Sequence, residues 1–363
     1  MHMADALLSP AVGGTMWAVS AGTIAYCSKE IRTETDPSKI PLMGVLGAFI
    51  FAAQMINFTI PVTGSSGHLG GGLILAILLG PYAAFLTIAS VLVVQALFFA
   101  DGGLLALGCN IFNLGFFPAF IAYPFIYRKI LGNQPTATRI SAASITAAIA
   151  GLQMGALAVV LETVSSGVSS LPFSTFVVVM QPIHLAIGIV EGLVTTAVVT
   201  FVCKARPELL QCTTEARSSG CHSVRGIALV FLALAVITGG FVSWFASKDP
   251  DGLEWSITKV TGQEELKGPG QGLHAALAAL QEKLAFLPDY SFRRPVAARK
   301  QPPETPTAQT HQAAQPEQAS DGSRSEGSKD PAGTSLAGFV GGMLTLGLAF
   351  LIGCALKRRK QCA

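Results

Sequence analysis

The first two residues of the chain can together chelate a metal ion. Met1 offers a terminal amine, and His2 offers its backbone nitrogen and its imidazole. These three nitrogens can close adjacent five- and six-membered rings on one ion, and they then lie in a plane. Because planar nitrogen ligation is typical of Ni(II) or Cu(II), a fourth planar donor would complete a site for such an ion. A bulky second residue disfavours removal of the initiator, so we expect Met1 to be retained.

His68 is the candidate for the fourth donor. It lies in the segment TGSSGHLGGG, whose glycines permit close backbone approach and unusual dihedral angles. A terminal histidine alone is more often disordered and a loop histidine alone is more often solvated, but we expect both on the same side of a strongly apolar chain, which favours a joint site. Asn57 and Ser66 are candidates for orienting His68 from outside the ligand set.

His184 and Glu191 form a second candidate pair. They lie seven residues apart in QPIHLAIGIVEGL, and so on one face of a helix. An ionisable group inside a membrane costs about 2.5–3.5 kcal/mol on insertion scales, so such groups normally face the bundle interior and are paired. A functional role and a purely structural role as a buried polar helix pair are both open.

The composition indicates a membrane protein. Of 363 residues, 51% are hydrophobic and only 12% are charged, against about 25% charged in soluble domains. The basic residues are not interleaved with aromatic ones on a folded face, so nucleic acid is not an expected partner. The sequence contains no G-x(4)-G-K-[ST] phosphate loop, so we expect no ATP hydrolysis by that route. We expect no bound organic cofactor.

The charge pattern predicts the membrane topology. Before the last apolar segment pair, lysine and arginine gather in short groups, and a further group closes the chain: 29–39, 128–139, 204–225 and 357–360. By the positive-inside rule these groups are cytoplasmic. The loops 61–70 and 163–181 carry no basic residue, so we expect them outside. The sequence therefore predicts a multi-pass protein of the cell (inner) membrane without a signal peptide, with its N-terminus outside and its C-terminus cytoplasmic.

Apolar segments predict an all-α polytopic fold. Six predicted transmembrane helices lie near 10–28, 40–60, 82–100, 106–127, 140–162 and 182–203. The apolar segment 69–79 is too short to cross, so we interpret it as a short or partly re-entrant helix, which makes seven elements. Two additional helices, near 226–246 and 335–356, flank an extracytoplasmic segment with one amphipathic helix at 272–286. Gly338 and Gly342 have the GxxxG spacing of a helix-packing face.

These elements predict three parts of the chain. The predicted division is a metal-capture membrane domain (1–205), a cytosolic linker (206–225) and a two-helix unit (226–356). The extracytoplasmic segment of this last unit spans 248–333. Its part 295–333 is rich in Pro, Gln, Ala, Ser and Glu, which predicts a flexible tether.

Three motifs together carry a family resemblance. The opening MHMADALLSP, the loop GSSGHLGGGL and the motif PDGLEW resemble the substrate-capture (M-type) component of energy-coupling factor (ECF) nickel/cobalt transporters, fused to the small N-type component. The resemblance covers about 1–205 and 226–356. It implies a bundle of S-component type whose extra first helix inserts its terminus into the core. It also implies Ni(II) or Co(II) as transported substrate, with Met1, His2 and His68 as ligands.

The resemblance further implies partners: a transmembrane coupling (T) component and cytosolic ATPase subunits, as in an ABC-type importer. The chain itself is then a transport component in the bilayer and not an enzyme. We expect an ATP-driven importer component for Ni(II), because the planar chelate favours nickel modestly over cobalt. The alternatives are a Co(II) importer component, a gradient-driven permease, and an intramembrane hydrolase that pairs Ser66 with His184. The hydrolase is disfavoured because the sequence lacks a G-x-S-x-G elbow.

Overall fold

A computed structural model describes the chain over residues 2–34, 39–133, 135–205, 225–263, 266, 268–292 and 331–361. Met1, nearly all of the predicted linker 206–225 and all but the end of the predicted tether 295–333 lie outside the described residues. Within the described part the fold is helical apart from one small hairpin. The predicted all-α class is therefore confirmed.

Helices account for each predicted apolar segment. The first part of the chain contains η1 (Asp5–Leu7), α1 (Pro10–Glu34), α2 (Lys39–Gln54), α3 (Gly72–Leu79), α4 (Pro81–Phe98), α5 (Leu107–Ile111), η2 (Phe112–Tyr127), α6 (Arg128–Leu131), α7 (Ala137–Ser166) and α8 (Phe173–Ala205). The second part contains α9 (Arg225–Gly240), η5 (Val242–Phe245), α10 (Gly252–Thr261), α11 (Gly272–Leu284), η6 (Pro288–Tyr290) and α12 (Pro331–Gln361).

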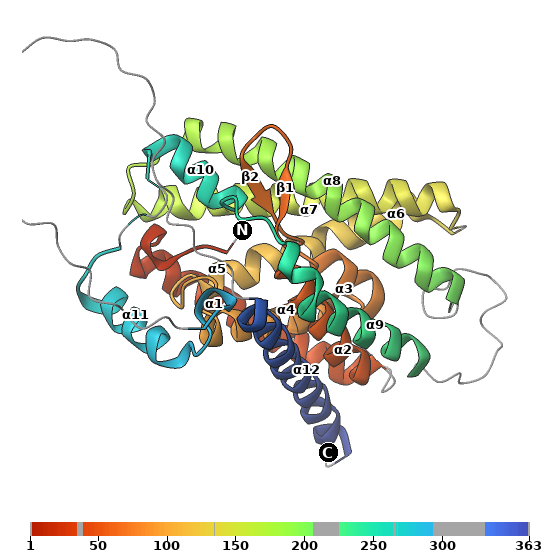
Figure 1. The fold of residues 1–363 in the computed structure, drawn as a ribbon. Coiled ribbons are helices and arrows are strands. Elements are labelled where there is room, and N and C mark those ends of the chain that lie inside the picture. Colours follow the sequence, from red (N-terminus) through yellow and green to blue (C-terminus); the bar gives the residue numbers. More distant parts are fainter. Residues whose placement is uncertain are drawn as a thin grey trace, which may run out of the picture.

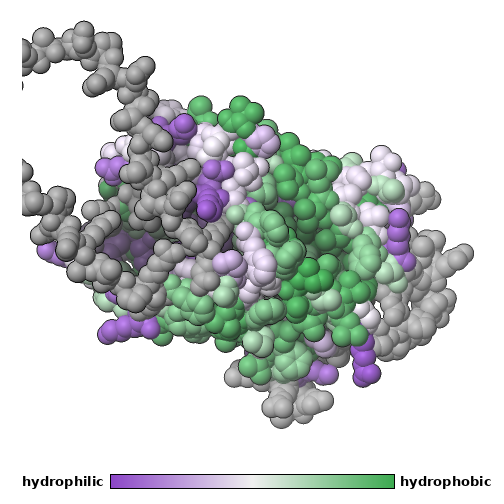
Figure 2. All heavy atoms as spheres, in the orientation of Figure 1, coloured by the Kyte–Doolittle hydropathy of each residue, from purple (hydrophilic) through white to green (hydrophobic). Residues whose placement is uncertain are grey.

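Several of these helices are suited to a bilayer. Among the described residues, five helical stretches are long and apolar enough to cross a membrane: Pro81–Phe98, Leu107–Leu131, Ala137–Ser166, Phe173–Ala205 and Pro331–Lys357. The shorter helices α2 and α9 are also apolar, and α1 is long enough but less hydrophobic. Figure 2 shows hydrophobic residues across the middle of one face and hydrophilic residues at its two ends, one over α10 and α11 and the other near α6. The protein is thus a multi-pass membrane protein.

One hairpin departs from the predicted helix near 40–60. Helix α2 ends at Gln54, and β1 (Phe58–Ile60) pairs antiparallel with β2 (Ser65–Gly67). Proline has no backbone N–H and glycine adopts positive φ, so Pro61 and Gly64, with φ of 71°, favour a turn between the strands. The hairpin lies beside α8 and α10 (Figure 1), and His68 directly follows β2.

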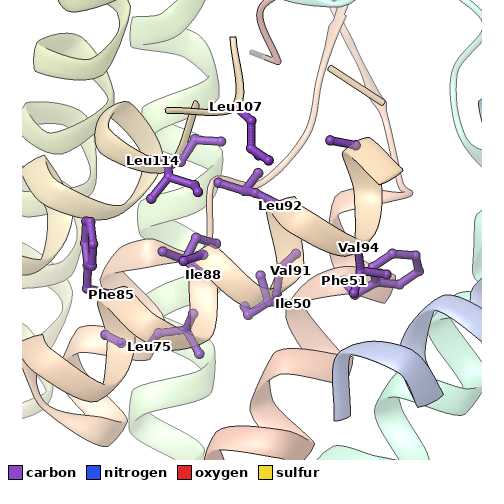
Figure 3. Close-up of a cluster of buried hydrophobic side chains, with 14 of the residues drawn as sticks. Ile50, Phe51, Leu75, Phe85, Ile88, Val91, Leu92, Val94, Leu107 and Leu114 are labelled. Carbon is purple, nitrogen blue, oxygen red and sulfur yellow. The ribbon is translucent and has the colours of Figure 1, made fainter. Parts of the chain in front are cut away.

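The short apolar segment after His68 is a buried helix, as predicted. Helix α3 ends at Gly80, whose φ of 87° permits a sharp turn, and Pro81 begins α4. The apolar side chains of α3, such as Leu75, pack against those of α2, α4 and α5, which include Ile50 and Ile88 (Figure 3). The removal of these apolar side chains from solvent makes a rigid base under the hairpin.

The segment between α9 and α12 lies on the same end of the bundle as the hairpin. We call its described residues 246–292 the connecting segment; it includes α10, α11 and η6, and its predicted amphipathic helix is α11. Helix α10 begins with a capping box, in which Asp251 accepts from the backbone of Leu253 and Glu254. In Figure 1, α10 lies beside β2 and α8, and α11 lies on the side of α1.

Glycines let α9 and α12 approach closely. A Cβ at Gly338 would lie 2.4 Å from the carbonyl oxygen of Gly239, whereas a Cβ at Gly342 would lie 3.9 Å from Ala48. Of the predicted pair on α12, Gly338 therefore makes a close contact with α9, whereas Gly342 faces α2 at an ordinary distance.

We expect Gly338→Ala to destabilise the protein by about 1–3 kcal/mol, because the added methyl group must force two backbones apart. Gly347→Ala is the matched control on α12, since a Cβ there meets nothing within 4 Å. Thermal unfolding in detergent checks both variants. Equal midpoints for the two would show that the α9–α12 contact does not stabilise the fold.

Candidate metal centre

An amide side chain fixes the start of the chain inside the bundle. Asn110 of α5 accepts from the backbone nitrogen of Met3 at 2.8 Å and donates to its carbonyl oxygen at 3.3 Å. The backbone nitrogen of Gly103 also donates to the Met3 carbonyl, at 2.9 Å. Since Met3 is fully buried, these bonds satisfy backbone groups that water cannot reach. They also fix the position of the adjacent His2.

The structure brings His2 and His68 together. Their ring centres lie 4.8 Å apart and their planes differ by 6°. With metal–nitrogen bonds of about 2 Å, two imidazoles on adjacent corners of a square-planar ion have ring centres about 4.5 Å apart. Both side chains are buried, with 6% of the His2 side chain and 7% of His68 exposed. The separation of the ring centres is therefore close to that of two imidazoles on one ion, but the rings are stacked and must turn to share it. The shared metal site stays a prediction.

Hydrogen bonding indicates which nitrogen of His68 can bind a metal. Its Nδ1 lies 3.1 Å from the carbonyl oxygen of Leu69. A carbonyl only accepts, so Nδ1 carries the proton and the lone pair is on Nε2. Burial lowers the pKa of His68 to about 3, so the ring is neutral at physiological pH, which is the form that binds metals.

Glu191 holds the loop that carries His68. Its two carboxylate oxygens accept from the backbone nitrogens of Gly70 at 2.8 Å and Gly71 at 3.1 Å. From the other side, Gln54 donates to the carbonyl oxygen of Gly70 at 2.8 Å. Gly71 has a φ of 76°, and a Cβ there would lie 2.7 Å from Ile50, so this position requires glycine. Glu191 thus positions the loop that carries His68 by accepting hydrogen bonds from the loop backbone.

His184 is buried on the same helix but has different partners. Its Nδ1 lies 2.8 Å from the carbonyl oxygen of Met180, and within the described part of the chain its Nε2 is buried without a hydrogen-bond partner. A Cβ on Gly252 of the connecting segment would lie 3.2 Å from the His184 ring. His184 and Glu191 share a buried helix face, as predicted. In the described structure, however, their hydrogen bonds run to separate backbone groups rather than to each other.

Ser66 and Asn57 contact the connecting segment. The Ser66 hydroxyl donates to the carbonyl oxygen of Asp249 at 2.8 Å. The backbone nitrogen of Ser66 donates to the carbonyl oxygen of Pro250, also at 2.8 Å. The carbonyl oxygen of Asn57 accepts from the backbone nitrogen of Ser247 at 2.6 Å. These bonds join the hairpin to the connecting segment. They do not run to the His68 imidazole. The Ser66 hydroxyl donates to a backbone carbonyl, whereas the hydrolase alternative paired it with His184.

Sequence reasoning missed Asp101 and Tyr290. The Asp101 carboxylate lies 3.0 Å from Nδ1 of His2 and accepts from the Tyr290 hydroxyl at 2.5 Å. Burial opposes ionisation of Asp101, but its contacts with His2 and Tyr290 outweigh burial and hold its pKa below the usual carboxyl range. Burial and the neighbouring Asp101 raise the pKa of Tyr290 well above its usual value, so this hydroxyl keeps its proton. A signal existed, because Asp101 is the sole acidic residue between Asp36 and Glu162.

We expect Glu191→Gln to weaken the metal site and to lower stability by about 1.5–3 kcal/mol, the contribution of hydrogen bonds to a charged group. Glutamine keeps one acceptor oxygen and turns an NH₂ group against a backbone N–H. Lys204→Gln, a charge change at the exposed end of the same helix, is the control. Thermal midpoints and nickel titration check both variants. Wild-type behaviour of Glu191→Gln would show that its carboxylate does not hold the loop.

Comparisons with known proteins show what each part of the chain is similar to. The family described as "cobalt uptake substrate-specific transmembrane region" (CbiM) matches residues 2–209, and the PDGLE domain matches residues 225–358. The fused nickel transport protein NikMN of Rhodobacter capsulatus is 29% identical over 320 residues, which cover 80% of this chain and 88% of that protein. The cobalt transport protein CbiM of Sorangium cellulosum is 30% identical over 215 residues, which cover 58% and 94%.

Solved structures share the fold of more than half of the chain. A crystal structure of a transition metal transporter is 29% identical, with a TM-score of 0.51, and the match covers 60% of this chain and 100% of that one. A crystal structure of a truncated transition metal transporter is 30% identical, with a TM-score of 0.50. The match covers 56% of this chain and 99% of that one. The chain therefore belongs to the family of cobalt uptake substrate-specific transmembrane regions and carries a PDGLE domain behind that region.

Proposed function

We propose that this protein is the substrate-binding membrane component of an ATP-driven ECF importer for Ni(II). The observation that carries the proposal is the pair of buried imidazoles, His2 and His68, with ring centres 4.8 Å apart at the end of the bundle. That spacing suits one ion, and nothing in ordinary packing requires two histidines to be buried against each other. The family supports transport of nickel or cobalt by such a component.

The proposed ligands are the amine of Met1, the backbone nitrogen and Nδ1 of His2, and Nε2 of His68. Among the described residues no group of three or more His, Cys, Asp or Glu side chains is placed to hold a metal. The two imidazoles therefore need donors of another kind, and the backbone nitrogens at the start of the chain are the nearest in sequence. Binding displaces the amide proton of residue 2, so loading releases protons.

Four planar nitrogens favour Ni(II) over Co(II). Square-planar nitrogen ligation is typical of Ni(II) and Cu(II), whereas Co(II) prefers tetrahedral or higher coordination. Some relatives of this chain are named for nickel and others for cobalt. Import of Co(II) is thus the alternative, and the coordination plane is the reason to place nickel first.

The proposed topology puts the site at the outer surface. The N-terminus, the hairpin and the connecting segment lie outside, and the C-terminus is cytoplasmic, by the positive-inside rule. We propose a metal-capture domain over 1–205, a cytosolic linker over 206–225 and a two-helix unit over 226–356. Transport then depends on a transmembrane coupling component and cytosolic ATPase subunits, which supply the energy. ATP-independent uptake by the purified chain in liposomes would instead favour a gradient-driven permease.

We expect one extra residue before Met1 to abolish tight nickel binding, because it converts the chelating amine into an amide. Changes to residues outside the ligand set typically lower metal affinity about 10- to 100-fold, and the loss of a ligand should lower it further. His68→Ala should weaken binding comparably while the protein stays folded. Isothermal titration with nickel measures both, and one residue added after Ala363 is the control for the extension. Unchanged nickel affinity in the N-terminally extended protein would rule out the proposed site.

A further inference from the structure

The metal site is connected to the PDGLE domain through two side chains. The hydroxyl of Tyr290 donates to one oxygen of Asp101, and the other oxygen lies 3.0 Å from Nδ1 of His2. Asp101 follows α4, whereas Tyr290 lies in η6 of the connecting segment. A residue 189 positions along the chain from Asp101 thus reaches the first imidazole of the site through a single carboxylate.

The backbone around Tyr290 is held in an unusual conformation. Asp289 and Tyr290 have φ values of 50° and 57°, a region that residues with a Cβ rarely adopt. Such conformations persist only when the surroundings fix them, and they concentrate at functional sites. Here the backbone nitrogen of Asp289 donates to the carbonyl oxygen of Phe99 at 2.9 Å, and the Tyr290 ring stacks on the Phe99 ring at 5.1 Å. These contacts aim the hydroxyl at Asp101.

The loop that carries Asp101 is held by the same segment. Gln281 of α11 donates to the carbonyl oxygens of Ala96 at 2.9 Å and Gly102 at 2.7 Å. A Cβ on Gly102 would lie 3.3 Å from Cβ of His2, so the loop packs directly on the first imidazole residue. The connecting segment therefore fixes both the carboxylate and the backbone next to it.

The ring of His2 has one nitrogen paired and one without a partner. Its Nδ1 faces Asp101, and its Nε2 is buried with no hydrogen-bond partner among the described residues. Chelation through the backbone nitrogen of residue 2 requires Nδ1, because only this nitrogen closes a six-membered ring. A half-turn about the Cβ–Cγ bond frees Nδ1 for the ion. The same turn brings Nε2 to the place that Cε1 occupied. This place is next to the one that Nδ1 leaves, on the side of Asp101.

We propose that Asp101 is the carboxylate that orients His2 for metal binding, and that Tyr290 of the PDGLE domain is the positioning residue for Asp101. The inference rests on the proposed function. Metal-binding histidines generally donate their other ring N–H to a carboxylate, which fixes the ring and makes the bound nitrogen a better donor. After the turn both nitrogens of His2 have partners, the ion at Nδ1 and Asp101 on the Nε2 side. Tyr290 keeps that carboxylate in place.

The test uses the full-length protein with an unmodified N-terminus, nickel as the probe, and two readouts: affinity by isothermal titration and the visible absorption band of bound Ni(II). We expect Asp101→Asn to weaken nickel binding by about 10- to 100-fold. Tyr290→Phe keeps the ring that stacks on Phe99 and removes only the hydroxyl, so we expect a smaller loss and a shifted band. Tyr26→Phe, at a half-exposed tyrosine of α1, is the matched control and should change neither readout.

The double variant distinguishes positioning from general support of the fold. If Tyr290 acts through Asp101, the double variant of Asp101→Asn and Tyr290→Phe binds nickel no more weakly than Asp101→Asn alone. The inference is overturned if the affinity losses of the two single variants multiply in the double variant. It is also overturned if Tyr290→Phe binds nickel as tightly as the wild type or more tightly, or if it binds with a lower stoichiometry and an unshifted band. His68→Ala separates this failure from that of the proposed function. If His68→Ala loses nickel and Tyr290→Phe does not, the metal site stands and only the role of Tyr290 falls.

Discussion

The two-way hydrogen bonding between Asn110 and the backbone of Met3 is the contact on which the candidate site depends. A chain start has few neighbours and normally frays, because nothing offsets the entropy of ordering it. Here an amide inside the bundle supplies one acceptor and one donor to one residue, and Gly103 adds a second donor. His2 then has no freedom to leave, and its imidazole lies against that of His68. Without this clamp the first two residues would be a chelator in solution rather than half of a buried site.

The other half depends on a carboxylate that holds backbone rather than metal. Glu191 binds the nitrogens of two successive glycines beside His68, which fixes where the loop leaves the bundle. A loop of small residues can approach helix α2 closely, as the contact of Gly71 with Ile50 shows, but it has little packing of its own to keep it in place. Glu191, which the sequence paired with His184 on α8, thus acts on the candidate site indirectly, through hydrogen bonds to the loop.

The sequence predicted what depends on local pattern and missed what depends on contacts across the fold. Hydrophobic length predicted the helices, and residue chemistry predicted that His2 and His68 lie together, as they do in the structure. The hairpin at 58–67 was missed because Ser and Gly carry little strand signal, so the apolar pattern of α2 was extended too far. Asp101 stood out as an isolated acid in an apolar region, yet its two partners come from residues 2 and 290. Only the folded arrangement of the α4–α5 loop and the connecting segment reveals that juxtaposition.

The PDGLE domain is more than an appended helix pair, because its contacts with the first part of the chain surround the site on several sides. Asp249 and Pro250, just before its capped helix α10, accept hydrogen bonds from Ser66 of β2. His274 of α11 lies 2.8 Å from the carbonyl oxygen of Leu8, and Tyr290 of η6 donates to Asp101. Each imidazole is thus flanked by an element that the PDGLE domain holds. Many of these contacts are hydrogen bonds to backbone carbonyls, which water can replace, so segments held in this way can open locally without unfolding the helices. The candidate site is therefore assembled from both parts of the chain, and the placement of His2 and His68 depends on how the connecting segment packs on the bundle.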